Sequence, residues 1–400
     1  MVNQFAINLG FFMLVPYLAA YLGGTLGLAA WLVGLVLGVR NFSQQGMFLV
    51  GGTLADRLGY KKLIVAGCLL RSGGFALLAT VQSVPGILIG AAATGFAGAL
   101  FNPAVRAYLA EDSGERRVEA FAVFNTFYQA GILLGPLVGA ALVGFDFRIA
   151  AWVAAAIFSA LTVAQLFALP DDPGRTSAAR DSVLQNWGEI VANRRFILFS
   201  AAMIGSYVLS FQVYLVLPMM AQEWSSTPRW ASIITSGVFV VTGVVAIAGQ
   251  MGVTAWAGRT FGATQALVVG MIVMGLAFLP LIAPALIGGT RVVAAALFVT
   301  AIGLAVATIL IFPFEMDTIV RLADDRLVAT HYGMYNTIVG VGILIGNVAT
   351  GALFGWAVRH GMPVAVPIVL AAIGLTTAVV LARWRRADDL SAGRTRPAPA

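Results

Sequence analysis

The stretch FNTFYQAGILLG at residues 124–135 recurs as YNTIVGVGILIG at residues 335–346, a shift of 211 residues along the chain. Just upstream, LAED at 109–112 is matched by LADD at 322–325 with a shift of 213, so the two registers differ by two residues. A weaker pair is ADRLG at 55–59 and AGRTFG at 257–262. These matches predict that the chain is built from two similar halves.

The composition places both halves in a membrane. Hydrophobic residues make up 60% of the 400 residues, charged residues make up 10%, and the mean hydropathy is +0.92. A soluble domain carries about 25% charged residues, far more than this chain has. A membrane-crossing helix needs about 20 mostly apolar residues. Twelve stretches qualify: 4–22, 30–54, 62–80, 86–109, 118–143, 149–169, 196–221, 231–256, 264–283, 291–314, 330–357 and 364–383.

The twelve spans divide six and six, so the two halves have the same orientation and are related by a pseudo-twofold axis along the membrane normal. We therefore predict an all-α membrane protein with twelve transmembrane helices in two pseudo-symmetric six-helix bundles. The bundles are expected at 1–169 and 196–383, with a central cytoplasmic loop at 170–195 and a cytoplasmic tail at 384–400. In the loop, one helical face gathers apolar residues, which predicts a short amphipathic helix on the membrane surface. The alternative is an unstructured linker. The residues of that face are Val183, Leu184, Trp187, Ile190 and Val191.

The basic residues predict the orientation of the chain. Of the 24 Lys and Arg residues, 17 fall in even-numbered connections and the tail, and 4 fall in odd-numbered connections. Because basic residues concentrate on the cytoplasmic side, both termini are expected in the cytoplasm. The net charge of +7 then reflects topology, and no nucleic-acid partner is expected. The first span begins almost at Met1 with no small-residue cleavage site after it, so no cleavable signal peptide is expected.

Cysteine and histidine are too scarce for most metal or redox chemistry. Cys68 is the only cysteine, which excludes an internal disulfide and a four-cysteine zinc site, and the chain has 2 histidines. The sequence also has no convincing nucleophile–base pair or set of metal ligands. We expect no metal, no cofactor and no enzymatic activity.

The connection between the second and third spans reads GGTLADRLGYKKLIV at residues 51–65. Glycines there permit a tight turn, and Asp56 can accept hydrogen bonds from backbone N–H groups at the start of a neighbouring helix. This stretch resembles the signature of the major facilitator superfamily, which implies a latch that Asp56 forms with the helix starting near Thr330. The alternative is a basic anchoring loop. The matching residues of the latch are Gly52, Asp56, Arg57, Gly59 and Lys61.

Two further stretches narrow the resemblance. GILLGPLVGAAL at 131–142 is similar to the antiporter motif of drug/proton exchangers, with Gly131, Gly135 and Gly139 spaced every four residues and Pro136 among them. A generic face for close helix packing is the alternative. GLVLGVRNFSQQGMFLVGG at 34–52 resembles the MdtH-type branch of bacterial multidrug efflux carriers.

The resemblance implies proton-coupled efflux of amphiphilic drugs by rocker-switch alternating access, in the bacterial cytoplasmic (inner) membrane. Antibiotic resistance would follow from that activity. The proton gradient would supply the energy, and the partners would be the lipid bilayer, a small-molecule substrate and protons. Function as a monomer is expected. A channel or a non-transporting receptor fits the repeated halves poorly.

Ionisable side chains inside the bilayer are costly unless they are paired or hydrated, so they mark candidate sites. Arg40 lies about ten residues into its span, which places it about 15 Å deep at the helical rise. It could bind substrate in a central cavity, or it could be a structural arginine. In the first case a carrier for one physiological anion, metabolite or lipid is the alternative function. The candidates for the substrate cavity or for coupling are Arg40, Gln44, Arg71, Asn125, Tyr128, Tyr207, Gln212, Glu315, Asp317 and Asn336.

If Asp56 latches one conformation, Asp56→Asn should slow turnover and leave membrane insertion normal, because the amide keeps the shape of the carboxylate but loses its charge. Turnover in reconstituted vesicles and the amount of inserted protein are the two measurements. Unchanged transport would count against the latch.

Overall fold

A computed structural model of the chain describes residues 2–112, 117–170, 183–323 and 328–394. The N-terminal half is helical throughout these residues. Its helices are α1 (Val2–Phe12), α2 (Val15–Ala20), the π-helical turn η1 (Tyr21–Thr25), α3 (Ala30–Gln45), α4 (Phe48–Leu58), α5 (Tyr60–Thr80), α6 (Val84–Asp112), α7 (Arg117–Val143) and α8 (Phe147–Ala168).

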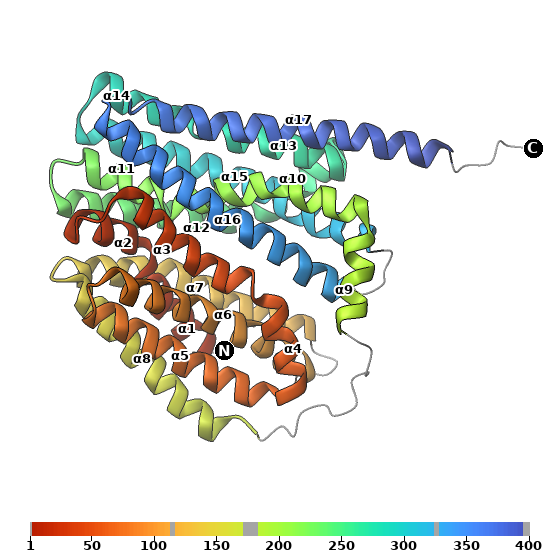
Figure 1. Ribbon diagram of the computed structural model, residues 1–400, viewed down its shortest axis with the longest axis horizontal. Helices are drawn as coiled ribbons and strands as arrows, with labels where there is room; N and C mark the ends of the chain where they lie inside the picture. Colours follow the sequence, from red (N-terminus) through yellow and green to blue (C-terminus); the bar gives the residue numbers. More distant parts are fainter. Residues whose placement is uncertain (1, 113–116, 171–182, 324–327, 395–400) are drawn as a thin grey trace, which may run out of the picture.

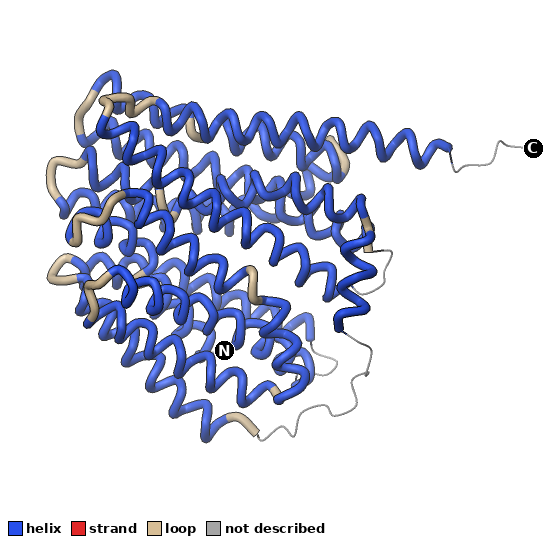
Figure 2. Tube along the Cα trace, viewed as in Figure 1, coloured by secondary structure: helices blue, strands red, loops and turns tan. Residues whose placement is uncertain are grey.

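The C-terminal half is built in the same way, and Figure 2 shows the helices joined by short loops. Its helices are α9 (Val183–Ala192), α10 (Arg194–Ser210), the 3-10 turn η3 (Phe211–Val213), α11 (Val216–Trp224), α12 (Pro228–Thr260), α13 (Ala263–Leu276), the 3-10 turn η4 (Leu279–Ile282), α14 (Ala283–Ile287), α15 (Thr290–Leu322), α16 (Val328–Arg359) and α17 (Ala365–Arg394).

The helices agree with the predicted spans. Within the described residues, 10 helical segments are long and apolar enough to cross a membrane. The span predicted at 30–54 is also helical, but it is interrupted between α3 and α4 and carries the polar run from Arg40 to Gln45. The span predicted at 118–143 forms α7, which includes the apolar stretch Ala130–Val143. The predicted fold class, an all-α membrane protein in two bundles, is confirmed.

The repeated stretches occupy equivalent places in the two halves. The first copy lies on α7 and the second on α16. A Cβ built on Gly131 or Gly135 would lie 2.6 Å from a side chain of α1. A Cβ built on Gly342 or Gly346 would lie 2.3 or 2.5 Å from a side chain of α10. Each repeat thus presents its glycines to the first helix of its own half, so α7 and α1 pack as α16 and α10 do.

The two halves meet along α3 and α16, which run side by side in Figure 1. A Cβ on Gly34 would lie 2.2 Å from the carbonyl oxygen of Asn347, and one on Gly351 would lie 2.3 Å from that of Ala30. Towards the other end of the pair, a Cβ on Gly340 would lie 2.7 Å from the backbone nitrogen of Gly46. Backbone therefore touches backbone over most of the length of this contact, and the halves are closed against each other here.

A glycine with positive φ turns the chain at the same place in both halves. Gly59 separates α4 from α5 with a φ of 90°, and Gly262 separates α12 from α13 with a φ of 70°. Other residues rarely adopt this region because their Cβ clashes with the backbone. The weak repeat of residues 55–59 in 257–262 thus preserves the residue that the turn requires.

The part of the central loop that the structure describes contains the helix α9. Ile190 is 1% exposed, whereas Val191 is 56% exposed, so the buried face of α9 is narrower than the predicted apolar face. This face lies against α16 and α10. The Asn193 side chain donates a hydrogen bond of 2.9 Å to the Leu322 carbonyl at the end of α15. The loop is therefore attached to the cytoplasmic end of the C-terminal half, as the predicted orientation defines that end.

We expect Gly34→Ala to lower the stability of the folded protein, because the new methyl group would clash with the backbone of α16. Overpacking of this kind costs about 1–3 kcal/mol. The measurement is the thermal unfolding temperature of the purified protein in detergent. Gly73→Ala is the matched control, since a Cβ at Gly73 of α5 meets nothing within 4 Å. Equal unfolding temperatures of the two variants would contradict the close contact.

Candidate functional site

The first span of each half is interrupted, and both interruptions come four residues before a proline. Pro16 follows the end of α1 at Phe12, and Pro218 follows the irregular backbone at Tyr214. A proline ring clashes with the carbonyl of the residue four places earlier and removes one helical hydrogen bond. Interrupted helices at corresponding places of two repeats indicate the binding site of a carrier.

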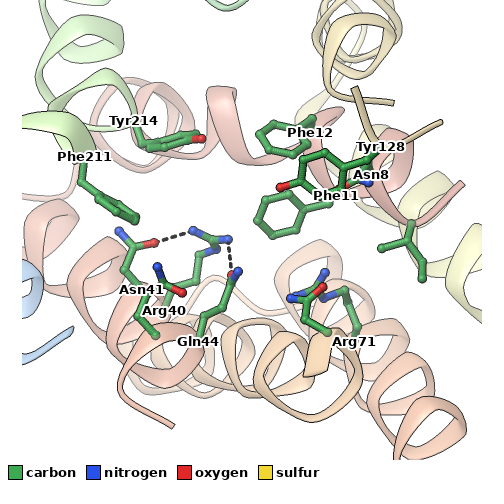
Figure 3. Close-up of a pocket in the computed structure, with 13 residues that line it drawn as sticks. Asn8, Phe11, Phe12, Arg40, Asn41, Gln44, Arg71, Tyr128, Phe211 and Tyr214 are labelled. Atoms are coloured by element: carbon green, nitrogen blue, oxygen red, sulfur yellow. Dashed lines mark hydrogen bonds between the residues drawn. The ribbon is translucent and has the colours of Figure 1, made fainter. Parts of the chain in front are cut away.

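A cavity of about 140 Å³ lies beside these two interruptions. Figure 3 shows its polar and aromatic side chains, which come from both halves. The N-terminal half supplies most of the lining, and the C-terminal half supplies the two aromatic residues that flank its interruption. The residues used below are Asn8, Phe11, Phe12, Arg40, Asn41, Gln44, Arg71, Asn102, Tyr128, Phe211 and Tyr214.

Arg40 of α3 lies in this cavity and is 4% exposed. It donates a hydrogen bond to the Asn41 side-chain oxygen and one of 3.1 Å to that of Gln44, both drawn in Figure 3. Its guanidinium carbon lies 4.5 Å from the centre of the Phe11 ring, within the range of a cation–π contact. Its Nε is buried and has no hydrogen-bond partner in the described part of the chain. Neutral groups therefore satisfy this cation only in part.

Arg71 of α5 lines the same cavity but is held differently. Its Nε and Nη2 donate hydrogen bonds of 3.1 and 2.9 Å to the Thr94 carbonyl of α6. Its guanidinium carbon also lies 4.8, 4.6 and 5.5 Å from the ring centres of Phe11, Phe101 and Phe158. These contacts join α5 and α6 to α1 and α8. Arg71 thus has a clear packing role in addition to lining the cavity.

The two acids at the end of α15 differ completely. Asp317 is exposed and forms an ion pair of 3.2 Å with Arg321 one turn later. Glu315 is 2% exposed, and its carboxylate accepts a hydrogen bond from the Tyr335 hydroxyl of α16. The Tyr207 hydroxyl of α10 is a second hydrogen-bond partner of Glu315. The structure therefore separates Glu315, a buried acid between three helices, from Asp317, a surface acid.

Other predicted cavity residues divide between the cavity and the helix packing. Gln44 and Tyr128 line the cavity. Tyr207, Gln212 and Asn336 are not among its described lining residues. The Gln212 and Asn336 side-chain amides each donate a hydrogen bond of 2.7 Å to a carbonyl one turn earlier in their own segment.

Several predicted residues lie outside the described side chains. They include Gly52, Asp56, Arg57 and Asn125, so the structure does not test their roles. The backbone of α4, which carries Asp56, contacts α16. Gly59 forms the turn described above, and Lys61 follows it at the start of α5.

The glycines of the motif at 131–142 pack against the first span, and Pro136 contributes a carbonyl. A Cβ on Gly139 would lie 2.0 Å from the Met13 carbonyl oxygen. The Tyr17 hydroxyl of α2 donates a hydrogen bond of 2.6 Å to the Pro136 carbonyl and pairs with the Ser236 hydroxyl of α12. Because α2 and α12 belong to different halves, Tyr17 is a hydrogen-bonded link between the two bundles.

A second cavity, of about 190 Å³, lies between α2, α11 and α16 at the end predicted to be extracellular. Along the first span, Tyr17 falls between Phe12, which lines the first cavity, and Ala19, which lines the second. The link to Ser236 therefore lies between the two cavities along the first span, and we expect it to act as a gate between them.

The residues of the site that were not predicted include Phe11, Asn102 and Tyr335. Phe11 lies five residues before Pro16, so the interruption of the first span could have indicated it. Tyr335 opens the second copy of the repeat, yet its partner Glu315 lies on another helix. Nothing in the sequence indicates that pairing.

We expect Tyr17→Phe to open the outer end of the molecule more often, because it removes the hydroxyl that joins the halves. The measurement is the rate at which a membrane-impermeant maleimide labels Ala20→Cys in the second cavity, with Cys68 replaced by alanine. A net contribution of about 0.5–1.5 kcal/mol per hydrogen bond predicts labelling about two- to tenfold faster. Ser236→Ala should raise the labelling rate by a similar factor. The double variant should label little faster than either single variant, because both remove the same hydrogen bond. Unchanged rates in both single variants would exclude the gate.

Known proteins resemble the chain over nearly its whole length. An uncharacterized MFS-type transporter of Mycobacterium tuberculosis is 55% identical over 395 residues, covering 98% of this chain and 93% of the relative. The multidrug resistance protein MdtH of Klebsiella pneumoniae is 28% identical over 388 residues, covering 96% and 92%.

Solved structures share the fold at low identity. The nucleoside transporter NupG (D323A mutant) matches with a TM-score of 0.79 at 15% identity, covering 96% of this chain and 98% of that one. A peptide transporter POT in complex with sulfate matches with a TM-score of 0.76 at 16% identity, covering 96% and 92%. The sequence pattern of the Major Facilitator Superfamily matches residues 1–347. The chain belongs to the major facilitator superfamily and is a multi-pass membrane transporter, not an enzyme.

Proposed function

We propose that this transporter exports amphiphilic small molecules across the bacterial cytoplasmic membrane in exchange for protons, by rocker-switch alternating access. The observation that carries the proposal is the buried carboxylate of Glu315, held by two tyrosine hydroxyls inside the C-terminal half. The relatives named MdtH, which are multidrug resistance proteins, support the choice of cargo.

Glu315 has the properties that a proton carrier needs. A carboxylate at a depth where water is scarce is costly when ionised, and protonation removes that cost. Its two known partners are neutral hydroxyls, so the protonated acid can keep its hydrogen bonds by donating or accepting through them. A shift of α15, α16 and α10 within the C-terminal half, coupled to the rocking of the two halves, would expose the acid to water and favour release of the proton.

A row of aromatic rings connects Glu315 with the cavity. The Tyr207 ring meets the Tyr335 ring edge to face, with centres 5.9 Å apart, and lies 6.4 Å from the Phe211 ring. Phe211 lines the cavity. Movement of cargo against Phe211 therefore has a direct mechanical path to the tyrosines that hold the carboxylate.

The cavity is too small for drug-sized cargo in the structure as it stands. Sites for such ligands measure about 300–1,000 Å³, against about 140 Å³ here. The close contact of α3 with α16 accounts for the small volume, because it closes the two halves around the cavity. Cargo would enter when this contact opens on one side of the membrane.

A carrier for one physiological anion is a second candidate. The observation that favours it is the charge of the cavity: its described lining residues include Arg40 and Arg71 and no aspartate or glutamate. This candidate shares the fold and the motion of the first, and differs in the range of cargo.

Glu315→Gln is the test of proton coupling. The amide imitates the protonated acid and cannot release a proton, so export driven by an imposed pH difference should fall by about tenfold or more, equivalent to about 1.4 kcal/mol. The measurement is substrate-induced proton movement in proteoliposomes, reported by a pH-sensitive dye, with neutral, anionic and cationic amphiphiles as substrates.

Asp317→Asn is the matched control, because it removes an acid two residues away that is exposed and paired with Arg321. It should keep proton-driven transport. Concentrative transport by Glu315→Gln under the pH difference would exclude Glu315 as the proton carrier. Concentrative transport by the unaltered protein without any pH difference would exclude proton exchange.

A further inference from the structure

We infer that the cargo is an amphiphilic acid, whose anionic group binds at Arg40 and Asn41 and whose apolar body lies against Phe11, Phe211 and Tyr214. The inference rests on the proposed function, since it names the chemical class of the exported molecule. The sequence left amphiphilic drugs and a physiological anion as separate candidates for the cargo. The inferred cargo has both properties in a single molecule.

The first support is the charge of the cavity. Two arginines line it, and its described lining residues contain no acid that could neutralise them. The other polar groups there are amides and phenols, such as those of Asn8, Asn102 and Tyr128. A buried cation without a counter-charge is costly, and an anion brought by the ligand would offset that cost.

The second support is that Arg40 and Arg71 differ in the donors that they leave open. Arg71 directs Nε and Nη2 to a single backbone carbonyl and is covered by aromatic rings. Arg40 has a buried Nε with no partner in the described part of the chain. Arg40 is therefore the cation that can accept a ligand without giving up a structural bond between helices.

The third support is a second open donor at the same place. Asn41 is 1% exposed, and its oxygen accepts a hydrogen bond from Arg40. Its Nδ2 is buried and has no hydrogen-bond partner in the described residues. Buried donors are normally satisfied, so unsatisfied N–H groups on two neighbouring residues indicate a place where a ligand's acceptor atoms bind. A carboxylate or sulfonate, which has several acceptor oxygens, fits this pair.

The fourth support is the aromatic side chains around these donors. Phe11 lies against the Arg40 guanidinium, and Phe211 and Tyr214 stand on the other side of the cavity in Figure 3, with ring centres 5.8 Å apart. Aromatic side chains bind apolar or aromatic bodies through area and stacking, with little demand on shape. The site therefore selects for an acidic group and tolerates variety in the remainder of the molecule.

The test uses two dyes that share one ring system. 8-Anilinonaphthalene-1-sulfonate carries a sulfonate, and N-phenyl-1-naphthylamine lacks it. Binding of each dye is titrated by fluorescence to the full chain in nanodiscs of zwitterionic lipid, with empty nanodiscs subtracted. Arg40→Gln should weaken binding of the sulfonate about tenfold or more and change binding of the neutral dye less than about twofold, as expected for loss of a charge-assisted hydrogen bond. Arg40→Lys, which keeps the charge, should restore part of the difference.

Arg229→Gln is the matched control. It removes the same charge from an exposed position at the start of α12 and should leave binding of both dyes unchanged, which excludes a general effect of net charge. Should Arg40→Gln not run as a single species in size exclusion, Asn41→Asp replaces it. An acid beside Arg40 would compete with the sulfonate and should weaken its binding selectively.

An equal loss of both dyes would show that Arg40 only packs the cavity, and no loss of either would show that the anion does not bind there. Both results overturn the inference. The titrations need no pH gradient, so they are independent of proton coupling. Selective sulfonate binding without proton-driven export would therefore overturn the proposed function and leave the inference standing. Proton-driven export of the neutral dye alone would overturn the inference and leave the proposed function standing.

Discussion

The backbone contact between α3 and α16 is the constraint on which the rest of the structure depends. The 2.2 Å that separates a Cβ on Gly34 from the Asn347 carbonyl shows that no larger residue fits without moving a helix. In a membrane the hydrophobic effect does not drive helices together, so van der Waals contact in such close packing supplies the attraction between them. It also keeps the cavity between the halves small, and in the proposed mechanism a ligand enters when this pair separates.

The buried charges are divided between the halves. The N-terminal half holds Arg40 and Arg71, and the C-terminal half holds Glu315, with aromatic rings between them. Each charge has its own solution to burial: Arg71 binds a backbone carbonyl, Glu315 binds two phenols, and Arg40 is left partly unsatisfied. In the proposed mechanism, a relative movement of the halves would change the surroundings of Arg40 and Glu315 together and so couple a proton to a ligand.

Much of the fold could be predicted from the sequence, because apolar length determines which segments cross a membrane and the repeat determines how they pair. Arg40 was identified by its distance along the span, and the structure buries its side chain. Glu315 and Asp317 show where such inference ends. Both acids lie near the same end of α15, and residues two positions apart on a helix are rotated by about 200°, so they face opposite ways. Which one is buried depends on how α15 packs against α16 and α10, and neither their spacing nor their depth carries that information.

The sequence did contain a signal for the interruption of the first span in each half, namely a proline within that span. Pro16 and Pro218 each act on the residue four places earlier, and those places border the cavity. The role of Arg71 was harder, because its acceptor is a backbone carbonyl, which any residue at position 94 would supply.

The small volume of the central chamber has a practical consequence. A rigid compound that seats its acid at Arg40, but is too wide for α3 and α16 to come together behind it, would stay lodged and stall the cycle. Added bulk on an otherwise acceptable cargo would then turn it into an inhibitor.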